Sequence, residues 1–306
     1  MISILLMKKI FQLFLIMFMG ILAVKVKILK TDDVSIISKI VLYIFGPCAI
    51  INCFQTEYTP ELGRGLLLSL AAGLLFQIII ISVCTGAKKI FRLSKVEYAS
   101  SIYSNSVNLL FPIVTSILGP EWLIYTAGYF TIQTFLFWSH LINTFSGEGF
   151  QIKKVLTNVN VIAVFAGLAM MFAGIRLPDL VGAPVAEVGG MIGPLSMFSI
   201  GMLMAKISLR QLLCSPKIYL VMAIRMLVCP AIILIVIKAT GMTGLVENGK
   251  QILLISLLAA GAPTANMVAQ FASLYDDEAS YASAVGSLTL LSCIITMPLL
   301  VFLYGM

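Results

Sequence analysis

The strongest constraint on this chain is a succession of apolar stretches, each long enough to cross a lipid bilayer as a helix. A bilayer core about 30 Å thick needs roughly 20 helical residues, and helices satisfy their own backbone polar groups in lipid. The sequence therefore predicts an all-α integral membrane protein with ten transmembrane helices. The predicted spans are residues 8–27, 34–54, 65–85, 96–117, 121–145, 156–175, 185–205, 216–238, 250–272 and 279–304.

Polar residues are too few to cover a water-soluble domain of this length. Hydrophobic residues make up 60% of the chain and charged residues 11%, whereas soluble domains carry about 25% charged residues. Ten spans use about two thirds of the 306 residues, so no soluble catalytic domain is expected. The first apolar segment runs on to Lys25 without a small-residue cleavage site, so we expect a first span and not a signal peptide.

Lysines and arginines predict how the spans are oriented, because basic residues are retained on the cytoplasmic side. The connections after odd-numbered spans are rich in them, and the opposite side has fewer. The rich connections contain Lys25, Lys27, Lys30, Lys88, Lys89, Arg92, Lys95, Lys153, Lys154, Lys206, Arg210 and Lys217. We therefore expect a multi-pass protein of the cell membrane with both termini on the extracytoplasmic side. The net charge of +7 reflects this topology and anionic lipid, so it implies no nucleic-acid partner.

The ten spans divide into two halves of five, which we place at residues 1–150 and 151–306. An odd number of spans requires the second half to be inverted, a recurrent design in secondary transporters. The fourth span of each half contains asparagine and proline, at Pro112 and at Pro263. Proline frees a backbone carbonyl, so such a break persists only inside protein or beside a water-filled cavity. Paired breaks of this kind indicate a transporter binding site.

The candidate substrate site consists of polar residues and prolines around these two breaks. They are Ser101, Asn105, Asn108 and Pro112 in the fourth span, and Pro263, Thr264, Asn266 and Gln270 in the ninth. The first four share one face of a continuous helix, as do Asn266 and Gln270. Amides are costly in hydrocarbon unless paired, so we expect these residues to face the interior. Their donors, with backbone N–H groups at half-helix N-termini, suit a carboxylate; hydrogen bonding between helices is the alternative interpretation.

Three further polar residues lie inside predicted spans. Gln133 and His140 are seven residues apart on the fifth span and share one face. An ion-coupling role is one interpretation for Ser101, Gln133 and Gln270, while His140 is either a proton-coupling group or a capping residue near the cytoplasmic end. Arg225 lies well inside the eighth span, where a charge marks a functional site. It neutralises a substrate charge, pairs with a helix C-terminus, or extends toward the inner face.

Patterns typical of metal, redox or enzymatic chemistry are missing from the sequence. The six cysteines include no C-x-x-C pair, and His140 is the single histidine. There is no H-E-x-x-H or G-x-S-x-G motif, and residues 244–250 (GLVENGK) lack the Ser or Thr that a phosphate-binding loop needs after its lysine. We therefore predict no enzyme, no cofactor and no metal.

Taken together, several stretches resemble the auxin efflux carrier family, which includes plant auxin exporters and bacterial malate or malonate permeases. The matching stretches are residues 105–112, which are similar to the family's N-x-G-x-x-G-x-P, residues 263–266 (PTAN), residues 194–205 (PLSMFSIGMLMA) and residues 289–298 (TLLSCIITMP), with Pro47, Arg225 and Pro230. Val107 and Leu110 stand where the family has glycines, so the fourth span has less freedom to unwind here. This departure bears mainly on substrate identity.

The resemblance implies a bile-acid-symporter-like fold, with spans four and nine broken and crossing near the midplane. Spans one, two, six and seven would form a scaffold and a homodimer surface, and the others a transport core that moves as an elevator. The substrate would be a small organic anion, either malate- or malonate-like or an aromatic carboxylate. Its transport would be driven by coupling to Na⁺ or H⁺, or by the membrane potential. A receptor on a transporter fold and, less favoured, a membrane-embedded enzyme are the alternatives.

Overall fold

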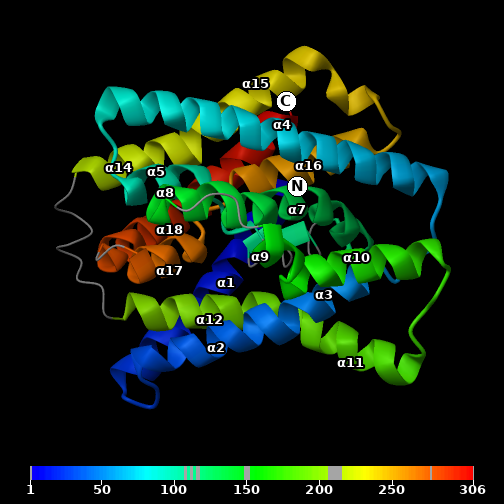
Figure 1. Cartoon of the computed structure of the whole chain (residues 1–306), viewed down its shortest axis with the longest axis horizontal. Coiled ribbons are helices and arrows are strands. Elements are labelled where there is room, and N and C mark those ends of the chain that lie inside the picture. The colour runs from blue at the N-terminus through cyan, green and yellow to red at the C-terminus, as the bar shows by residue number, and fades with distance from the viewer. Residues whose placement is uncertain are drawn as a thin grey trace.

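The protein is helical almost throughout, as its apolar sequence predicts. A computed structural model describes residues 2–106, 109–110, 113–114, 118–147, 152–205, 216–275 and 278–305. Within these residues, the only β-type pairing outside helices is one isolated antiparallel bridge between Ser104 and Thr264 (Figure 1).

The helical elements of the first half occupy the predicted apolar stretches in several pieces. They are α1 (Ile2–Lys25), η1 (Thr31–Asp33), α2 (Val34–Ile40), η2 (Val41–Phe45), α3 (Gly46–Cys53), α4 (Pro60–Phe91), α5 (Lys95–Ile102), η3 (Pro120–Tyr125), α7 (Thr126–Leu136), η4 (Phe137–Leu141) and α8 (Ile142–Ser146). Of these, η2 and η4 are turns of π-helix that continue the flanking α-helices.

The elements of residues 152–305 are likewise helical. They are α9 (Ile152–Leu156), α10 (Val159–Phe172), α11 (Asp179–Gly190), α12 (Ile192–Met204), α14 (Pro216–Ala223), the π-helical turn η5 (Ile224–Val228), α15 (Cys229–Thr240), η6 (Met242–Gly244), α16 (Gly249–Ala260), α17 (Asn266–Tyr275) and α18 (Ala279–Gly305).

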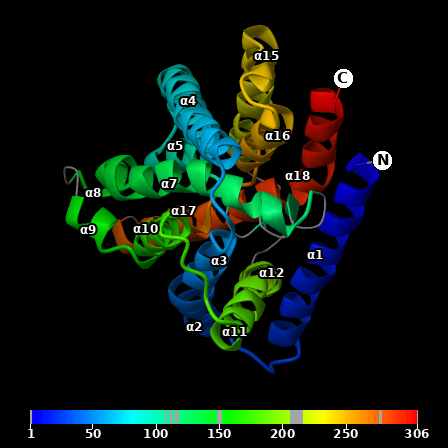
Figure 2. The same cartoon turned by 90° about the vertical axis from the view of Figure 1, so that its right-hand side faces the viewer.

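The helices form two groups with a middle layer between them. In both views α4, α5, α15 and α16 lie on one side, and α2, α3, α11 and α12 lie on the other (Figures 1 and 2). Helices α7, α10 and α17 lie between these groups. This middle layer is where the candidate site is found.

Glycines let helix backbones approach closely where α12 packs against α1 and where α11 packs against α3. A Cβ added at Gly201 in α12 would overlap the carbonyl oxygen of Met17 in α1. A Cβ added at Gly189 in α11 would lie 2.7 Å from Cα of Ala49 in α3. Lipid tails are as apolar as leucine, so membrane helices associate through such close contacts between small residues.

Length and apolar composition identify three spans among the described residues. They are Pro60–Phe91, Asp179–Met202 and Pro216–Thr240, and a fourth is added if Ala279–Cys293 and Ile295–Gly305, which meet at 49°, are one span. The predicted class, a helical membrane protein, is confirmed. Helix α1 covers most of the first predicted stretch without a break, whereas residues 34–54 are divided by the π-helical turn η2 and residues 121–145 by the π-helical turn η4.

Two segments without helical structure meet in the middle layer. Helix α5 ends at Ile102 and α16 ends at Ala260. Beyond these ends, the Asn105 N–H donates to the Pro263 carbonyl oxygen at 2.7 Å, and the Ala265 N–H donates to the Tyr103 carbonyl oxygen at 2.9 Å. Backbone groups freed by one break are thus satisfied by the other, as irregular backbone at membrane depth requires. We call residues 103–105 and 261–265 the crossover.

Candidate functional site

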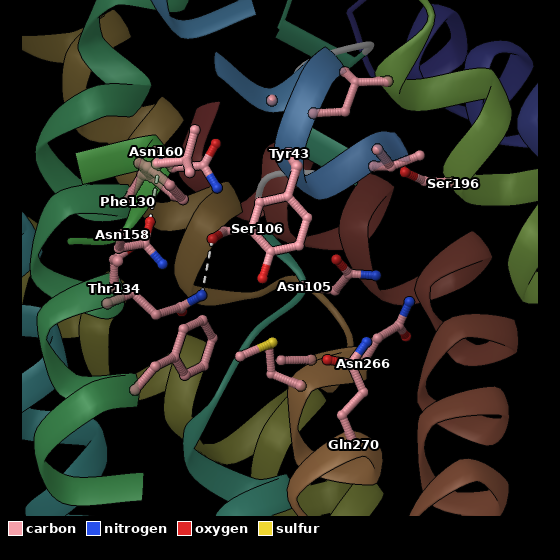
Figure 3. A pocket seen from close by; sticks show the side chains of 18 of the residues that line it. Tyr43, Asn105, Ser106, Phe130, Thr134, Asn158, Asn160, Ser196, Asn266 and Gln270 are labelled. Carbon is pink, nitrogen blue, oxygen red and sulfur yellow. Dashed lines mark hydrogen bonds between the residues drawn. The ribbon is translucent and has the colours of Figure 1, made fainter. Parts of the chain in front are cut away.

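A cavity of about 300 Å³ opens beside the crossover. Its lining comes from the crossover and the residue after it, from the middle layer with η4, and from the helix group that contains α3 and α12, together with η2 (Figure 3). The lining residues are Val41, Tyr43, Gly46, Ser104, Asn105, Ser106, Phe130, Gln133, Thr134, Phe137, Trp138, Thr157, Asn158, Val159, Asn160, Ile192, Ser196, Ser199, Ala265, Asn266, Met267 and Gln270. None of these residues, in the part of the chain that the structure describes, carries a formal charge.

Gln133 in α7 holds the crossover segment around Ser104 beside the cavity. Its side-chain oxygen accepts a hydrogen bond from Ser104 Oγ at 2.6 Å, and its amide nitrogen donates to the Ser104 carbonyl oxygen at 2.7 Å. The same nitrogen donates to Ser106 Oγ at 3.1 Å. Gln133 is therefore placed to hold the backbone on both sides of Asn105. The sequence suggested an ion-coupling role for this residue; its contacts are to the crossover.

Asn105, Asn266 and Gln270, all singled out from the sequence, line the same cavity. Asn105 comes from the crossover, whereas Asn266 and Gln270 project from the first turns of α17 (Figure 3). Because α17 begins at Asn266, its N-terminus faces the cavity. The first N–H groups of a helix have no acceptor within it, and the helix dipole adds about half a positive charge there. This side of the cavity therefore favours a negatively charged ligand.

The opposite wall is built from η2, α10 and α12. Asn158 caps α10, because its side-chain oxygen accepts from the Asn160 N–H at 3.0 Å. Ser196 in α12 is buried, and its hydroxyl has no hydrogen-bond partner within the described residues. An unpaired buried hydroxyl is costly, and Ser196 is among the residues that line the cavity. Tyr43 of η2 points into the cavity from this wall (Figure 3).

Arg225 lies outside the cavity, although it is fully buried. Its Nε and Nη2 donate to the Ala262 carbonyl oxygen at 3.1 and 2.9 Å, and Nη2 also reaches the Ala260 carbonyl oxygen at 2.6 Å. Nη1 donates to the Ile102 carbonyl oxygen at 3.1 Å. Ile102 and Ala260 end α5 and α16, so the guanidinium joins two helix C-termini. The sequence left three roles open for Arg225, and these contacts correspond to one of them, pairing with helix C-termini.

Ser101 of α5 and the crossover residues Pro263 and Thr264 do not line the cavity. The Ser101 hydroxyl donates to the carbonyl oxygen of Glu97 at 2.8 Å, and the Thr264 hydroxyl donates to that of Ser100 at 2.9 Å. The expectation that Ser101 and Asn105 share a continuous helix face is wrong, because α5 ends before Asn105. The residue that follows the helix, Tyr103, is extended, with φ −93° and ψ 127°. Asn108 and Pro112 lie outside the described residues.

His140 belongs to a hydrogen-bonded chain beside the crossover and does not line the cavity. Its Nδ1 lies 2.7 Å from the hydroxyl of Tyr103, and its Nε2 lies 3.3 Å from that of Tyr98. The Tyr98 hydroxyl also lies 2.9 Å from Thr85 Oγ1 in α4. His140 is half-buried and links η4 to α5 and, through Tyr98, to α4.

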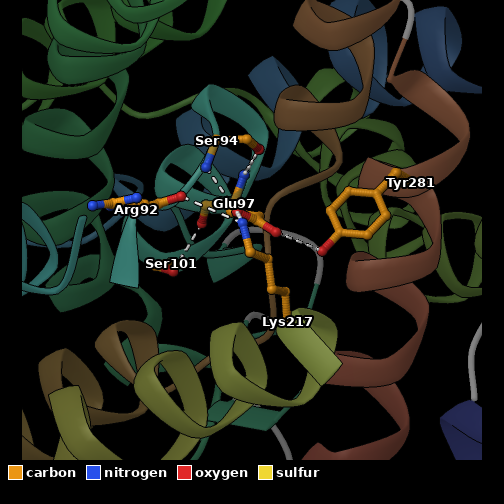
Figure 4. Close-up of polar contacts among 6 residues, drawn as sticks. All are labelled: Arg92, Ser94, Glu97, Ser101, Lys217 and Tyr281. Carbon is orange, nitrogen blue, oxygen red and sulfur yellow. Dashed lines mark hydrogen bonds and ion pairs between the residues drawn. The ribbon is translucent and has the colours of Figure 1, made fainter. Parts of the chain in front are cut away.

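A buried carboxylate that the sequence did not single out fixes the start of α5. Glu97 is 3% exposed and forms a capping box with Ser94, whose N–H donates to Glu97 Oε2 at 2.7 Å (Figure 4). The hydroxyl of Tyr281 in α18 donates to Glu97 Oε1 at 2.9 Å, and Lys217 Nζ in α14 lies 3.5 Å from Oε2. Glu97 thereby ties α5 to α14 and α18.

Several lining residues were missed because their signals are weak in one sequence. Asn158 and Asn160 sit at the start of an apolar span, and Ser196 and Ser199 are three residues apart in the stretch that resembles the family. A polar pair at helical spacing inside an apolar helix is the signal that could have found the serines. Tyr43 carries no such signal, because an aromatic residue in an apolar run is compatible with a lipid-facing position.

Comparison with known proteins bears on what this architecture does. The sequence profile described as membrane transport protein matches residues 5–301. The comparison with curated proteins finds no match. A match over almost the whole chain shows that the protein belongs to this family of membrane transport proteins, the auxin efflux carrier family that its motifs resemble.

Proposed function

We propose that the protein carries a small organic anion across the membrane and binds it in the cavity beside the crossover. The observation that carries this proposal is the meeting of Asn105, Asn266, Gln270 and the N-terminus of α17 in one cavity. The side-chain amide N–H₂ groups donate hydrogen bonds, and the helix N-terminus adds partial positive charge. A carboxylate accepts such bonds through about four lone-pair positions.

The charges around the crossover support an anion over a cation. The described lining has no carboxylate to neutralise a cation, and the α17 N-terminus supplies partial positive charge. The negative ends of α5 and α16 are already paired with Arg225. The two kinds of helix terminus are thus separated, and the one that faces the cavity attracts anions.

We infer ten spans arranged as two inverted five-helix repeats, residues 1–150 and 151–306. Two packing contacts support this, because α1 packs against α12 and α3 packs against α10. These pairs are spans one and seven, and spans two and six, which inversion would exchange. The connections after α1 and α4 lie at one end of the molecule, left in Figure 1, and those after α3, α10 and α15 at the other. The first set is rich in lysine, which supports a cytoplasmic location and extracytoplasmic termini.

The proposed mechanism is an elevator, in which spans three to five and eight to ten move against a scaffold of spans one, two, six and seven. The cavity supports this division, because its crossover wall comes from spans four and nine of the proposed transport core, whereas η2, α10 and α12 come from spans two, six and seven of the proposed scaffold. A scaffold homodimer would fix the reference frame for this movement. Coupling to Na⁺ or H⁺ would drive uptake, whereas the membrane potential contributes about 2.3 kcal/mol per 100 mV to export of a monoanion.

The test is flux of labelled carboxylates into proteoliposomes that contain the wild type or Asn105→Ala. We expect the variant to lose most transport and keep its expression and elution profile, since Asn105 is replaced on a backbone held by Gln133. Asn143→Ala on α8 is the matched control, because Asn143 is exposed and does not line the cavity. Unchanged flux in Asn105→Ala would remove this cavity as the site.

The same assay separates the proposal from its alternatives. A carrier moves the carboxylate across the bilayer unchanged. A receptor on the same fold binds it, as seen by a ligand-dependent rise in unfolding temperature, but gives no flux. An enzyme returns a chemically altered product. Either of the last two results would overturn the proposed function.

A further inference from the structure

Tyr43 is an aromatic residue held in an unusual position on the wall facing the crossover. It lies in η2, one turn of π-helix between α2 and α3. Such turns are rare and frequent at functional sites, because the widened turn redirects the side chains that it carries. The ring lines the cavity and points into it (Figure 3), yet the residue is 58% exposed. A large part of the ring therefore has no protein atom against it.

The backbone that carries Tyr43 is fixed by its neighbours. A Cβ added at Gly46, directly after η2, would lie 2.6 Å from Oδ1 of Asn160 and 3.3 Å from the Val41 carbonyl oxygen. The chain here is in direct contact with α10, which leaves little room for η2 to shift inward. Tyr43 is accordingly presented to the cavity by an element packed against α10, the arrangement expected of a residue that positions a ligand.

The position of Tyr43 determines which part of a ligand it would meet. If a carboxylate binds at Asn105 and Asn266, the rest of the molecule extends toward the opposite wall. Phe130, Phe137 and Trp138 add apolar and aromatic surface to the lining. A cavity of about 300 Å³ is within the range for small-molecule sites, so it has room for a carboxylate whose body is one ring.

We propose that Tyr43 is a specificity-determining residue, whose ring packs against the flat body of the carboxylate and selects planar over saturated ligands of equal size. This inference rests on the proposed function, since it assumes that Asn105 and Asn266 hold the carboxylate. Contacts between aromatic rings contribute beyond the area they bury, which corresponds to a preference of about three- to tenfold.

The experiment compares benzoate with cyclohexanecarboxylate, which share a carboxylate and a six-membered ring but differ in planarity. Binding to the purified full-length protein is measured by calorimetry for the wild type, Tyr43→Phe and Tyr43→Leu. We expect the wild type and Tyr43→Phe to prefer benzoate by about three- to tenfold. Tyr43→Leu, which keeps an apolar side chain without a ring, should bring the two affinities within about twofold. Tyr43→Met is a second ring-free variant if the leucine variant does not fold.

The control is Phe165→Leu on α10, which removes a ring of similar exposure, 59%, that does not line the cavity. Its preference should equal that of the wild type. A benzoate preference that persists in the folded ring-free variants would overturn the assignment of Tyr43. Equal affinity of the wild type for both ligands, with binding still dependent on Asn105, would overturn the Tyr43 proposal alone. Failure of both ligands to bind, or binding indifferent to Asn105→Ala, would count against the proposed function itself.

Discussion

Replacing Arg225 is the sharpest test of how the crossover is held together. The guanidinium makes four hydrogen bonds to the carbonyl oxygens of Ile102, Ala260 and Ala262. Those carbonyls belong to the last residues of α5 and α16 and to the crossover segment that follows α16. Arg225→Gln keeps much of the side-chain length but removes the charge and most of the donors. We therefore expect a loss of stability and not a selective loss of anion affinity.

The size of the loss follows from the carbonyls that are left without a donor. A buried acceptor without a partner costs about 1–3 kcal/mol, so three carbonyls represent roughly 3–9 kcal/mol. The glutamine amide can donate to one of them. Removing a buried guanidinium also relieves several kcal/mol of desolvation, which offsets part of the cost. The expected net destabilisation is about 2–4 kcal/mol.

The measurement is the unfolding midpoint in detergent, followed together with binding of a monocarboxylate and a dicarboxylate. Arg225→Gln should unfold at a lower temperature and lose both ligands to the same extent. Arg64→Gln is the matched control, because Arg64 is exposed and pairs with Glu61 within one helix at 3.0 Å. A surface pair of this kind contributes about 0–1 kcal/mol, so the control should be close to the wild type.

One result would refute this reasoning. If Arg225→Gln unfolded at the wild-type temperature but lost affinity in proportion to ligand charge, the guanidinium would be acting on the substrate. The hydrogen bonds to the three carbonyls would then contribute little to stability. Arg225→Lys refines the test, since it keeps the charge but lacks the planar fork that reaches several carbonyls at once. It should be intermediate in stability.

The remaining predictions concern helix packing. Gly201→Ala should weaken the protein by about 1–3 kcal/mol, because the new methyl group would overlap the Met17 carbonyl oxygen; Gly86→Ala, with nothing within 4 Å of the new Cβ, should be neutral or slightly stabilising. Thermal unfolding of both variants tests this, and equal midpoints would contradict it. Glu97→Ala should cost about 1–3 kcal/mol, because it leaves buried donors unpaired, whereas Lys217→Ala, at the half-exposed end of that ion pair, should cost less than about 1 kcal/mol. A larger effect from the lysine would reverse the order expected from burial.

The sequence predicts where the helices break but not how the breaks are held. Asparagine and proline inside apolar spans are costly enough that their positions indicate a break, and Pro263 does lie in one. The sequence does not predict which groups satisfy the backbone at these breaks. Arg225 binds carbonyls 35 to 123 residues away in the chain, and nothing in its local sequence distinguishes this from contact with a substrate. Only the three-dimensional packing makes that choice.

The helix faces were less predictable for a related reason. The spacing of Ser101 and Asn105 implies one shared face only while the helix continues, and α5 stops between them. For Tyr43, a lipid-facing and a cavity-facing aromatic residue have the same local pattern. The π-helical turn that directs it inward is set by packing against α10, where Gly46 allows the approach. Hydrophobic periodicity carries no information on such a turn.

At the crossover, the helix C-termini are paired with a charged side chain and the helix N-terminus is not, and this difference bears on the charge of the ligand. The C-termini of α5 and α16 carry partial negative charge, and a permanent cation of the protein, Arg225, satisfies both. The N-terminus of α17 carries partial positive charge, and no acidic side chain among the described lining residues neutralises it. A cation site at the same place would need the reverse arrangement, with C-termini open to the cavity and N-termini closed. An uncompensated N-terminus in a low-dielectric surrounding attracts an anion more strongly than the same terminus would in water. If the cavity is the proposed anion site, this arrangement selects the sign of the ligand without a charged side chain, and release breaks no full ion pair.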